Sequence, residues 1–179
     1  IGVAPFVIFS THDAGFWLPN ALETIASCSI WQPCNSATIA DAFRRMFDEY
    51  AALTGGSPDF VPFQGHDFSF RGMSSRETAC LSGAGHALSF MGSDTIPVIG
   101  WMEQYYNANC EKECIICSVP ATEHSVMCMG GKESEIETFR RLFRLYPAGI
   151  LSVVSDTWDY WNVIVNTLPQ LRQEILARN

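Results

Sequence analysis

The sequence predicts an α/β protein built around parallel strands. Short runs of β-branched and apolar residues alternate with longer segments in which apolar residues recur at helical spacing. This alternation is typical of a parallel α/β sheet or barrel. The chain has 179 residues, of which 47% are hydrophobic and 17% are charged. That size and composition suit one folded domain and exclude an intrinsically disordered chain.

The first third of the chain predicts a strand followed by two helices. Residues 3–9 are apolar and read as a strand, because no basic region precedes them as it would in a signal peptide. Residues 17–25 predict a first helix. A second helix starts at Ser36 or Thr38, carries apolar residues at every third or fourth position, and ends at Gly55-Gly56.

The middle of the chain predicts a strand and two more helices. Residues 60–70 form the next extended segment, and a capping box over residues 74–77 opens a helix of small residues. Within that helix, the small residues 83–85 indicate close packing against another helix, because the third glycine of a nucleotide-binding loop is missing. Ser93 or Asp94 caps the helix that follows.

The last third of the chain predicts two strands and two helices. Residues 115–119 and 149–155 are apolar and rich in β-branched side chains, which is typical of buried strands. Residues 133–146 predict an amphipathic helix with a basic outer face. Residues 158–168 predict a final helix, and Pro169 starts a new turn or helix.

The charge balance limits the classes of partner. The chain has 11 Lys and Arg against 19 Asp and Glu, a net charge of −8. An acidic chain is a poor ligand for nucleic acid. No apolar run is long enough to cross a membrane, so we expect neither nucleic acid nor membrane as a partner, and a cytoplasmic location. The chain starts inside a predicted strand without Met, which indicates a piece of a longer protein.

The seven cysteines allow two interpretations. Cys110, Cys114 and Cys117 are spaced like part of a zinc site, and His124 and Cys128 follow them. A second close couplet is missing, however, and Cys117 lies in an apolar run. We therefore favour free, mostly buried thiols over a metal site, which suits a reducing compartment.

Polar side chains follow three of the predicted strands. His66 and Arg71 belong to the first group, His124 to the second and Asp156 to the third. Ligands of parallel α/β folds bind at the carboxyl ends of strands, so these residues are candidates for an active site. His124 is the best single candidate, as a nucleophile or general acid–base oriented by Asp156. The alternative is that each polar residue caps a helix.

Four motifs carry a resemblance to a known family. They are HDFSFRGMSS at residues 66–75, GSDT at residues 92–95, SVPATEHS at residues 118–125 and SVVSD at residues 152–156. Their order and spacing resemble those of nicotinamide phosphoribosyltransferases, which have HDF-x-[YF]-RG-x-SS, G-[ST]-D-T, SVPA-x-EHS and SVVSD. Together the motifs span nearly the whole chain.

The resemblance implies a fold and a reaction. The fold would be part of an irregular parallel α/β barrel of the type II phosphoribosyltransferase kind. Residues 1–179 would form a single α/β unit, a fragment of the catalytic barrel region, with residues 15–56 as a helical segment outside the barrel. The family transfers phosphoribosyl from phosphoribosyl pyrophosphate to nicotinamide, giving nicotinamide mononucleotide and pyrophosphate in NAD biosynthesis.

The resemblance also implies roles for single residues. Phe68 would stack on the pyridine ring, and Arg71 would contact the ring substituent or a nearby phosphate. Asp94 would accept a hydrogen bond from the carboxamide nitrogen. The same pocket would be lined by Ser118, Val119 and Ser152. His124 would be phosphorylated from ATP, the coupling substrate, with Asp156 orienting it. Mg²⁺ would act through the pyrophosphate, and the enzyme would be a homodimer.

Two alternatives stay open beside this function. The first is a nicotinate phosphoribosyltransferase, which Asp94 disfavours because its carboxylate would repel that of nicotinate. The second is a non-catalytic chain that binds ligand or complements another chain. The family's R-x-D segment and glycine-rich phosphate loops have no match in this sequence. We therefore expect the isolated chain to be inactive and to hold no tightly bound cofactor.

Overall fold

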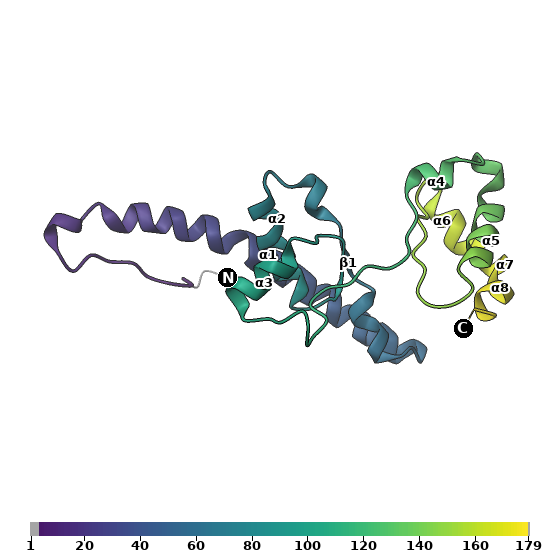
Figure 1. Ribbon diagram of the computed structural model, residues 1–179, viewed down its shortest axis with the longest axis horizontal. Helices are drawn as coiled ribbons and strands as arrows, with labels where there is room; N and C mark the ends of the chain where they lie inside the picture. Colours follow the sequence, from purple (N-terminus) through teal and green to yellow (C-terminus); the bar gives the residue numbers. More distant parts are fainter. Residues whose placement is uncertain (1–3, 179) are drawn as a thin grey trace. The chain divides into compact units, whose positions relative to one another are not determined.

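The computed structural model describes residues 4–178 (Figure 1). The chain divides into two compact units, residues 1–118 and residues 119–179. The first contains η1 (Asp13–Gly15), α1 (Leu18–Thr54), η2 (Pro58–Phe63), β1 (His66–Asp67), η3 (Ser69–Gly72), α2 (Arg76–Ala87), β2 (Gly92–Ser93) and α3 (Val98–Tyr106). The second contains α4 (His124–Cys128), η4 (Lys132–Ser134), α5 (Glu135–Leu145), α6 (Tyr160–Asn162), η5 (Val163–Thr167), α7 (Leu168–Gln170) and α8 (Arg172–Leu176).

The long helix α1 replaces the two helices that the sequence predicts for its region. It runs unbroken through Pro33, which lacks an N–H and so removes one helical hydrogen bond. The predicted stop is confirmed, because Gly55 follows the helix in the left-handed conformation at φ 71°. Packing against α2 covers α1 around Pro33, where the carbonyl of that residue faces Gly85. This support explains why the proline does not end the helix.

Helix α2 confirms the prediction of close packing by small residues. A Cβ atom on Gly85 would lie 2.4 Å from the carbonyl oxygen of Pro33 and 3.0 Å from the backbone nitrogen of Ala37. The two helix backbones therefore approach more closely than any other residue at this position would allow. The N-cap differs by one position from the predicted capping box: Ser75 accepts a hydrogen bond from the backbone N–H of Thr78.

The sheet of the first unit is small and parallel. β1 pairs with β2 so that His66 lies opposite Gly92 and Asp67 opposite Ser93. A single parallel bridge joins Gly92 to Cys117. The α/β class with parallel pairing is thus confirmed, and within residues 4–178 the extended segments do not form a barrel.

Most of the predicted strands are shorter than expected. Residues 60–70 form only β1, because Pro58 and Pro62 hold the preceding residues in a 3-10 turn and η3 follows at once. Residues 115–119 and 149–155 contribute single bridges, at Cys117 and Ser152.

The predicted opening strand over residues 3–9 is also wrong in the part that can be assessed. Residue 3 lies outside the described residues, and residues 4–9 form no strand. Val7 and Phe9 are 79% and 75% exposed, so no neighbouring segment pairs with this stretch or covers it. An extended segment without a hydrogen-bonding partner is not a strand.

The second unit packs its helices around one apolar cluster. The amphipathic helix predicted over residues 133–146 is confirmed as α5. The final predicted helix also forms, as α6, η5 and α7 in succession, with η5 in π-helical geometry. Pro169 stands in the first turn of α7, which begins one residue earlier, so the predicted start of a new turn or helix is confirmed to within one residue. The buried cluster consists of Met127, Phe139, Leu142, Val163 and Leu171.

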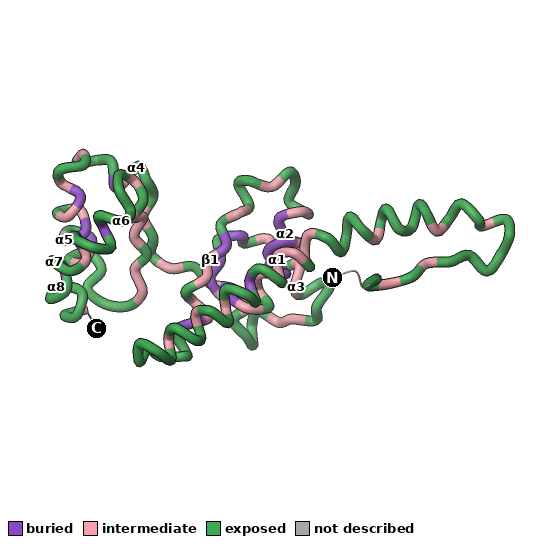
Figure 2. The backbone as a smooth tube through the Cα atoms, turned by 180° about the vertical axis from the view of Figure 1, so that it is seen from behind, coloured by how far each residue is buried: buried purple, intermediate pink, exposed green. Residues whose placement is uncertain are grey.

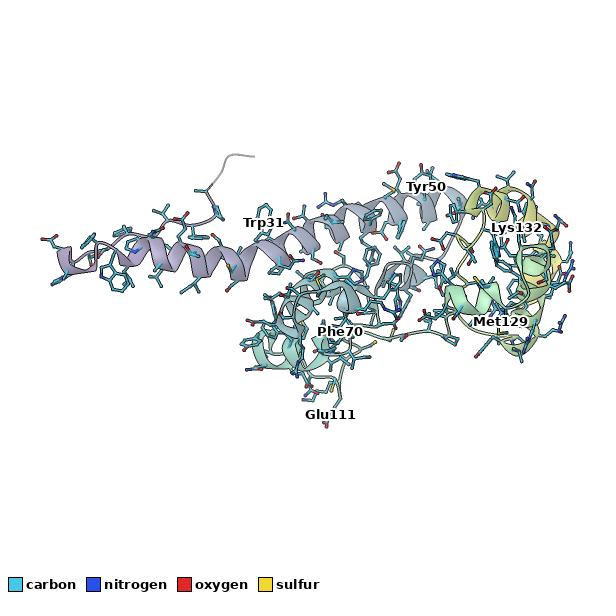
Figure 3. All side chains as sticks on the ribbon, turned by 90° about the horizontal axis from the view of Figure 1, so that it is seen from above. Trp31, Tyr50, Phe70, Glu111, Met129 and Lys132 are labelled. Atoms are coloured by element: carbon cyan, nitrogen blue, oxygen red, sulfur yellow. The ribbon has the colours of Figure 1, made fainter. Side chains whose placement is uncertain are left out.

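Burial is uneven along the chain (Figure 2). In the first unit it concentrates on α2 and β2, whereas α1 buries only Ala40. Large apolar side chains of α1 are exposed, and Figure 3 shows Trp31 and Tyr50 projecting outward from this helix. No helix among residues 4–178 combines the length and the apolar character that crossing a bilayer requires.

Candidate functional site

Three extended segments of the first unit end at one edge of the parallel sheet. Just after β2, the backbone N–H of Asp94 donates to the carbonyl of Asp67, the last residue of β1, at 2.7 Å. On the other side of β2, the N–H of Ser93 donates to the carbonyl of Cys117 at 3.0 Å. The residues that follow the three segments are Phe68, Asp94 and Ser118. Their side chains therefore leave the sheet at its carboxyl edge, where ligands of parallel α/β folds bind.

The Asp94 carboxylate is the centre of this group. The Ser118 hydroxyl donates to Asp94 Oδ1 at 2.5 Å, and His66 Nε2 lies 3.1 Å from the same oxygen. His66 also contacts Phe68, with 5.7 Å between the ring centroids. The structure thus joins the two predicted site residues Asp94 and Ser118 directly, and it adds His66 to them.

A cavity of about 330 Å³ opens beside Asp94. It is lined by Phe68, Phe70, Arg71 and Asp94. The cavity combines two aromatic faces, one guanidinium and one carboxylate. Such a set suits a small planar ligand that carries a hydrogen-bond donor. Three predicted site residues, Phe68, Arg71 and Asp94, therefore line one cavity.

The electrostatic environment keeps Asp94 ionised. Partial burial by itself would raise the pKa of the Asp94 carboxyl. Hydrogen bonds from Ser118 and His66, together with electrostatic attraction from His66 and Arg71, outweigh this burial, and the pKa lies below its usual value. The group is thus a charged acceptor throughout the neutral pH range.

Asp94 does not act as a helix cap in this structure. Helix α3 begins at Val98, and Pro97 occupies the N-cap position. Ser93, not Asp94, accepts a local hydrogen bond, from the backbone N–H of Thr95. The Asp94 side chain is used instead for Ser118 and His66. The capping alternative considered from the sequence is therefore wrong.

His66 is the site residue that the sequence analysis did not assign. It stands in the group of polar residues after a predicted strand, but no role was given to it. A signal was available, because His66 and Phe68 are two positions apart in an extended segment and so share one face. The spacing therefore places His66 beside Phe68, although His66 is not among the residues that line the cavity.

The second unit brings together the predicted histidine and aspartate. His124 is the first residue of α4, and Asp156 follows the bridged segment at Ser152. His124 Nε2 and Asp156 Oδ1 are 3.0 Å apart. Both side chains are about two-thirds exposed, at 64% and 66%. When Nε2–H donates to Asp156, the lone pair stays on Nδ1, which then is a nucleophile or a base.

Local pairing explains how these two residues meet. A parallel bridge joins Ala121 to Ser152, and the N–H of Thr122 donates to the carbonyl of Ser152 at 3.1 Å. The Thr122 hydroxyl in turn accepts from the N–H of Val154 at 2.9 Å. His124 and Asp156 thus follow two paired segments, as the strand-end argument predicts. Val119 and Ser152, the other predicted pocket residues, lie in this unit, half-buried and exposed respectively.

The described residues offer no metal centre. Among residues 4–178, no three His, Cys, Asp or Glu side chains converge in a way that could hold an ion. All seven cysteines are free thiols, but only Cys80 is buried, so the prediction of mostly buried thiols is wrong.

Both sites stand at the carboxyl ends of parallel segments, one as a polar aromatic pocket and one as a histidine–aspartate pair. This arrangement is that of an α/β protein whose polar side chains gather where its parallel segments end. The sequence profile of the nicotinate phosphoribosyltransferase (NAPRTase) family matches residues 63–179. The chain belongs to this family.

Three similar curated proteins are named nicotinamide phosphoribosyltransferase. Nicotinamide phosphoribosyltransferase of Acinetobacter baylyi is 49% identical over 177 residues, which are 98% of this chain and 34% of the relative. The Mycoplasma pneumoniae protein of the same name is 39% identical, over 90% of this chain and 33% of its own length. That of Xanthomonas campestris is 33% identical, over 95% and 36%. The chain therefore spans about a third of the length of these relatives.

Proposed function

We propose that this chain forms the nicotinamide-binding part of a nicotinamide phosphoribosyltransferase. Such an enzyme joins phosphoribosyl from phosphoribosyl pyrophosphate to the ring nitrogen of nicotinamide and releases pyrophosphate, a step of NAD biosynthesis. The names of the relatives and the family support the proposal. The observation that carries it is the ionised Asp94, held by two donors beside a cavity with aromatic walls.

The geometry of Asp94 suits an amide. Ser118 and His66 both contact Oδ1, so we propose that Oδ2 receives the N–H of the carboxamide. An ionised carboxylate accepts such a bond more strongly than a neutral group does. Phe68 would stack on the pyridine ring, and Arg71 would bind an oxygen of the ring substituent or of a phosphate. The roles of Val119 and Ser152 as ring-pocket residues stay predictions.

His124 is proposed to accept a phosphoryl group from ATP. Its hydrogen bond to Asp156 fixes the orientation of the ring and stabilises the cation that forms during the transfer. The exposure of both side chains leaves room for a bulky phosphate donor. Phosphorylation would then couple ATP hydrolysis to the affinity for the substrates.

The transfer step itself, with its Mg²⁺ and pyrophosphate, concerns the whole protein. The Asp94 and Phe68 side chains would orient nicotinamide, and orientation is the main contribution a protein makes to a transfer of this kind. Mg²⁺ would accompany the pyrophosphate as part of the substrate, because it binds phosphate oxygens and keeps several of its waters. Since the chain covers about a third of its relatives, we propose that it does not complete the transfer by itself.

The partners and location follow the same proposal. We propose a homodimer for the whole enzyme and a cytoplasmic location, which the seven free thiols support because reducing compartments keep cysteines unpaired. The alternative is a non-catalytic chain that only binds ligand or complements another chain. Phosphoribosyl transfer by the full-length protein would exclude it.

Substitution of Asp94 tests the proposed substrate. In the full-length protein, Asp94→Ser and the isosteric Asp94→Asn should shift the ratio of kcat/KM for nicotinamide over nicotinate toward nicotinate. We expect a shift of roughly 30-fold, about 2 kcal/mol, which is modest for a charged hydrogen bond because Asp94 is 48% exposed.

The matched control is Ser93→Ala, which removes a neighbouring hydroxyl that bonds the backbone of Thr95 rather than the cavity. It should leave the ratio unchanged. An unchanged ratio in both Asp94 variants, with normal folding, would show that the amide preference arises elsewhere. The nicotinate alternative predicts the opposite for the unsubstituted protein, namely a preference for nicotinate.

A further inference from the structure

The loop between α3 and Cys117 carries a pair of thiols that neither site uses. Cys114 and Cys117 have two residues between them in the segment Cys-Ile-Ile-Cys. The Cys114 thiol is exposed and the Cys117 thiol is half-buried. The two thiols lie within hydrogen-bonding reach of each other, and burial together with this contact raises the pKa of Cys117.

The backbone is fixed by hydrogen bonds on both sides of the pair. Before the pair, the side chains of Asn109 and Glu113 close a turn, with the N–H of Asn109 donating to Glu113 Oε1 at 2.8 Å. After the pair, Cys117 is fixed to β2, because its N–H donates to the carbonyl of Met91 at 2.7 Å. Only three residues, Cys114 to Ile116, separate these anchors from each other. Closing a ring between the two sulfurs therefore costs little chain entropy.

Cys110, in the same loop, is bound differently. Its thiol donates to Glu103, and this hydrogen bond raises the pKa of Cys110. Its backbone N–H donates to Glu103 Oε1 at 3.1 Å. Thiolate is the reactive form of cysteine, so the carboxylate makes Cys110 a poor nucleophile.

We propose that Cys114 and Cys117 are a redox-active dithiol that closes to an intraloop disulfide when it meets a small organic disulfide. The exposed Cys114 thiolate attacks the oxidant, forms a mixed disulfide and expels one thiolate. The Cys117 thiolate then attacks the Cys114 sulfur and expels the second. Two protein thiols are oxidised, one organic disulfide is reduced to two thiols, and the two protons pass to these products through water.

The loop sets a preference among oxidants. Glu111 and Glu113 precede the pair in the loop, against the single Lys112, and Figure 3 shows Glu111 at the outer end of the loop. A cationic disulfide should therefore approach faster than an anionic one. Cystamine, with two ammonium groups, is the suitable probe, and oxidised glutathione is the anionic comparison.

Peptide mapping tests the proposal in the full-length protein. Cleavage after Lys112 and Lys132 yields one peptide with Cys114, Cys117 and Cys128, so Cys128→Ser is the parent. After cystamine treatment and blocking of free thiols, this peptide should be two hydrogens lighter than the reduced form and carry no blocking group. Cys114→Ser should lose this product, whereas Cys110→Ser should keep it. Oxidised glutathione should form it more slowly.

Two results would overturn the proposal. One is a parent peptide that is blocked at both thiols after prolonged cystamine treatment. The other is a lighter peptide in Cys114→Ser, which would place the bond elsewhere. The measurement needs no nicotinamide and no activity, so its outcome is independent of the proposed function.

Discussion

Asp94 and His124 depend on short side-chain contacts rather than on deep burial. Asp94 is held by Ser118 and His66, and His124 is held by Asp156. All of these residues follow or belong to short extended segments. A polar side chain that is exposed and yet oriented by a neighbour is ready to bind a ligand without first breaking a core contact.

The proposed coupling role of His124 predicts a selective loss. In the full-length protein, His124→Ala should abolish the stimulation of nicotinamide mononucleotide formation by ATP, while the transfer without ATP falls by less than about threefold. The reason is that His124 lies in the His–Asp pair rather than in the cavity lined by Asp94. Asp156→Asn should weaken the stimulation without removing it.

Steady-state rates with and without ATP check this prediction. The comparison variant is Ser125→Ala, next to His124 in the same short helix, which should retain the stimulation. Equal losses in both assays for His124→Ala would mean that the residue serves the transfer itself and not the coupling.

Glu135 offers a pH-dependent test of stability. This carboxyl is 6% exposed, and burial, together with the charge of Asp159, raises its pKa against the opposing effect of Lys132. A raised pKa means that the folded state holds the proton more tightly than the unfolded state does. The contribution of this group to the free energy of unfolding is therefore full below the ordinary pKa of Glu. It is lost as the pH rises through the raised pKa of the folded state.

Replacing Glu135 by Gln removes that loss. The free energy of unfolding of the Glu135→Gln variant should exceed that of the unsubstituted protein by up to about 1 kcal/mol at pH 7, and the difference should shrink toward pH 4. Urea unfolding at the two pH values measures it. A difference that grows toward pH 4 would contradict the argument.

The elements of the chain were predictable to different degrees. The amphipathic pattern of α5 is long and regular, so its helix could be located from sequence. The small residues of α2 correctly indicated a close helix contact. The strands could not be located, because pairs of two residues and single bridges are fixed by contacts with distant segments and leave almost no local pattern.

The site and α1 likewise contain features that the sequence could predict and features that it could not. Phe68, Arg71 and Asp94 could be grouped because their motifs resemble a known family. The spacing of His66 to Phe68 was a further signal, but its contact with Asp94 depends on the register of β1 and β2. Pro33 suggested a break between two helices, since local sequence does not show that α2 supports the chain there. Tertiary contact overrides local propensity in both cases.

Gly85 tests the packing of α1 against α2. Gly85→Ala would place a Cβ against the backbone of Pro33 and Ala37, which cannot move aside as a flexible side chain could. We expect a loss of stability of roughly 1–3 kcal/mol, as for other overpacked sites. Thermal unfolding followed by circular dichroism measures it.

Gly100→Ala is the matched control for that substitution. Gly100 also lies in a helix, α3, and a Cβ there would meet no atom within 4 Å. This variant should gain up to about 1 kcal/mol from helix propensity. If Gly85→Ala were as stable as Gly100→Ala, the two helices would have to pack less closely than described.

At the scale of the whole molecule, α1 leaves an apolar stripe uncovered. Ile39, Phe43, Met46, Tyr50 and Leu53 are between 49% and 71% exposed. Their spacing of three and four residues places them on one face of the helix. An exposed stripe of this kind, together with the unpaired edges of the small sheet, favours association between chains.

We therefore expect the isolated 179-residue chain to form a dimer or a larger species. Light scattering from micromolar to millimolar concentration should show a mass above that of the monomer. Met46→Glu, which places a charge in the stripe, should shift the chain toward the monomer, whereas Ala52→Glu on another face of α1 should not. A stable monomer over the whole concentration range would contradict this expectation.

The parallel register described above also has a consequence for the order of folding. β1 meets β2, and β2 meets Cys117, only across an intervening helix, so each pairing closes a long loop before it gains any hydrogen bond. Helices α2 and α3 form from local contacts and carry no such cost. The carboxyl edge that aligns Phe68, Asp94 and Ser118 is thus among the last features to assemble. A chain that stops short of this step has its helices but no pocket.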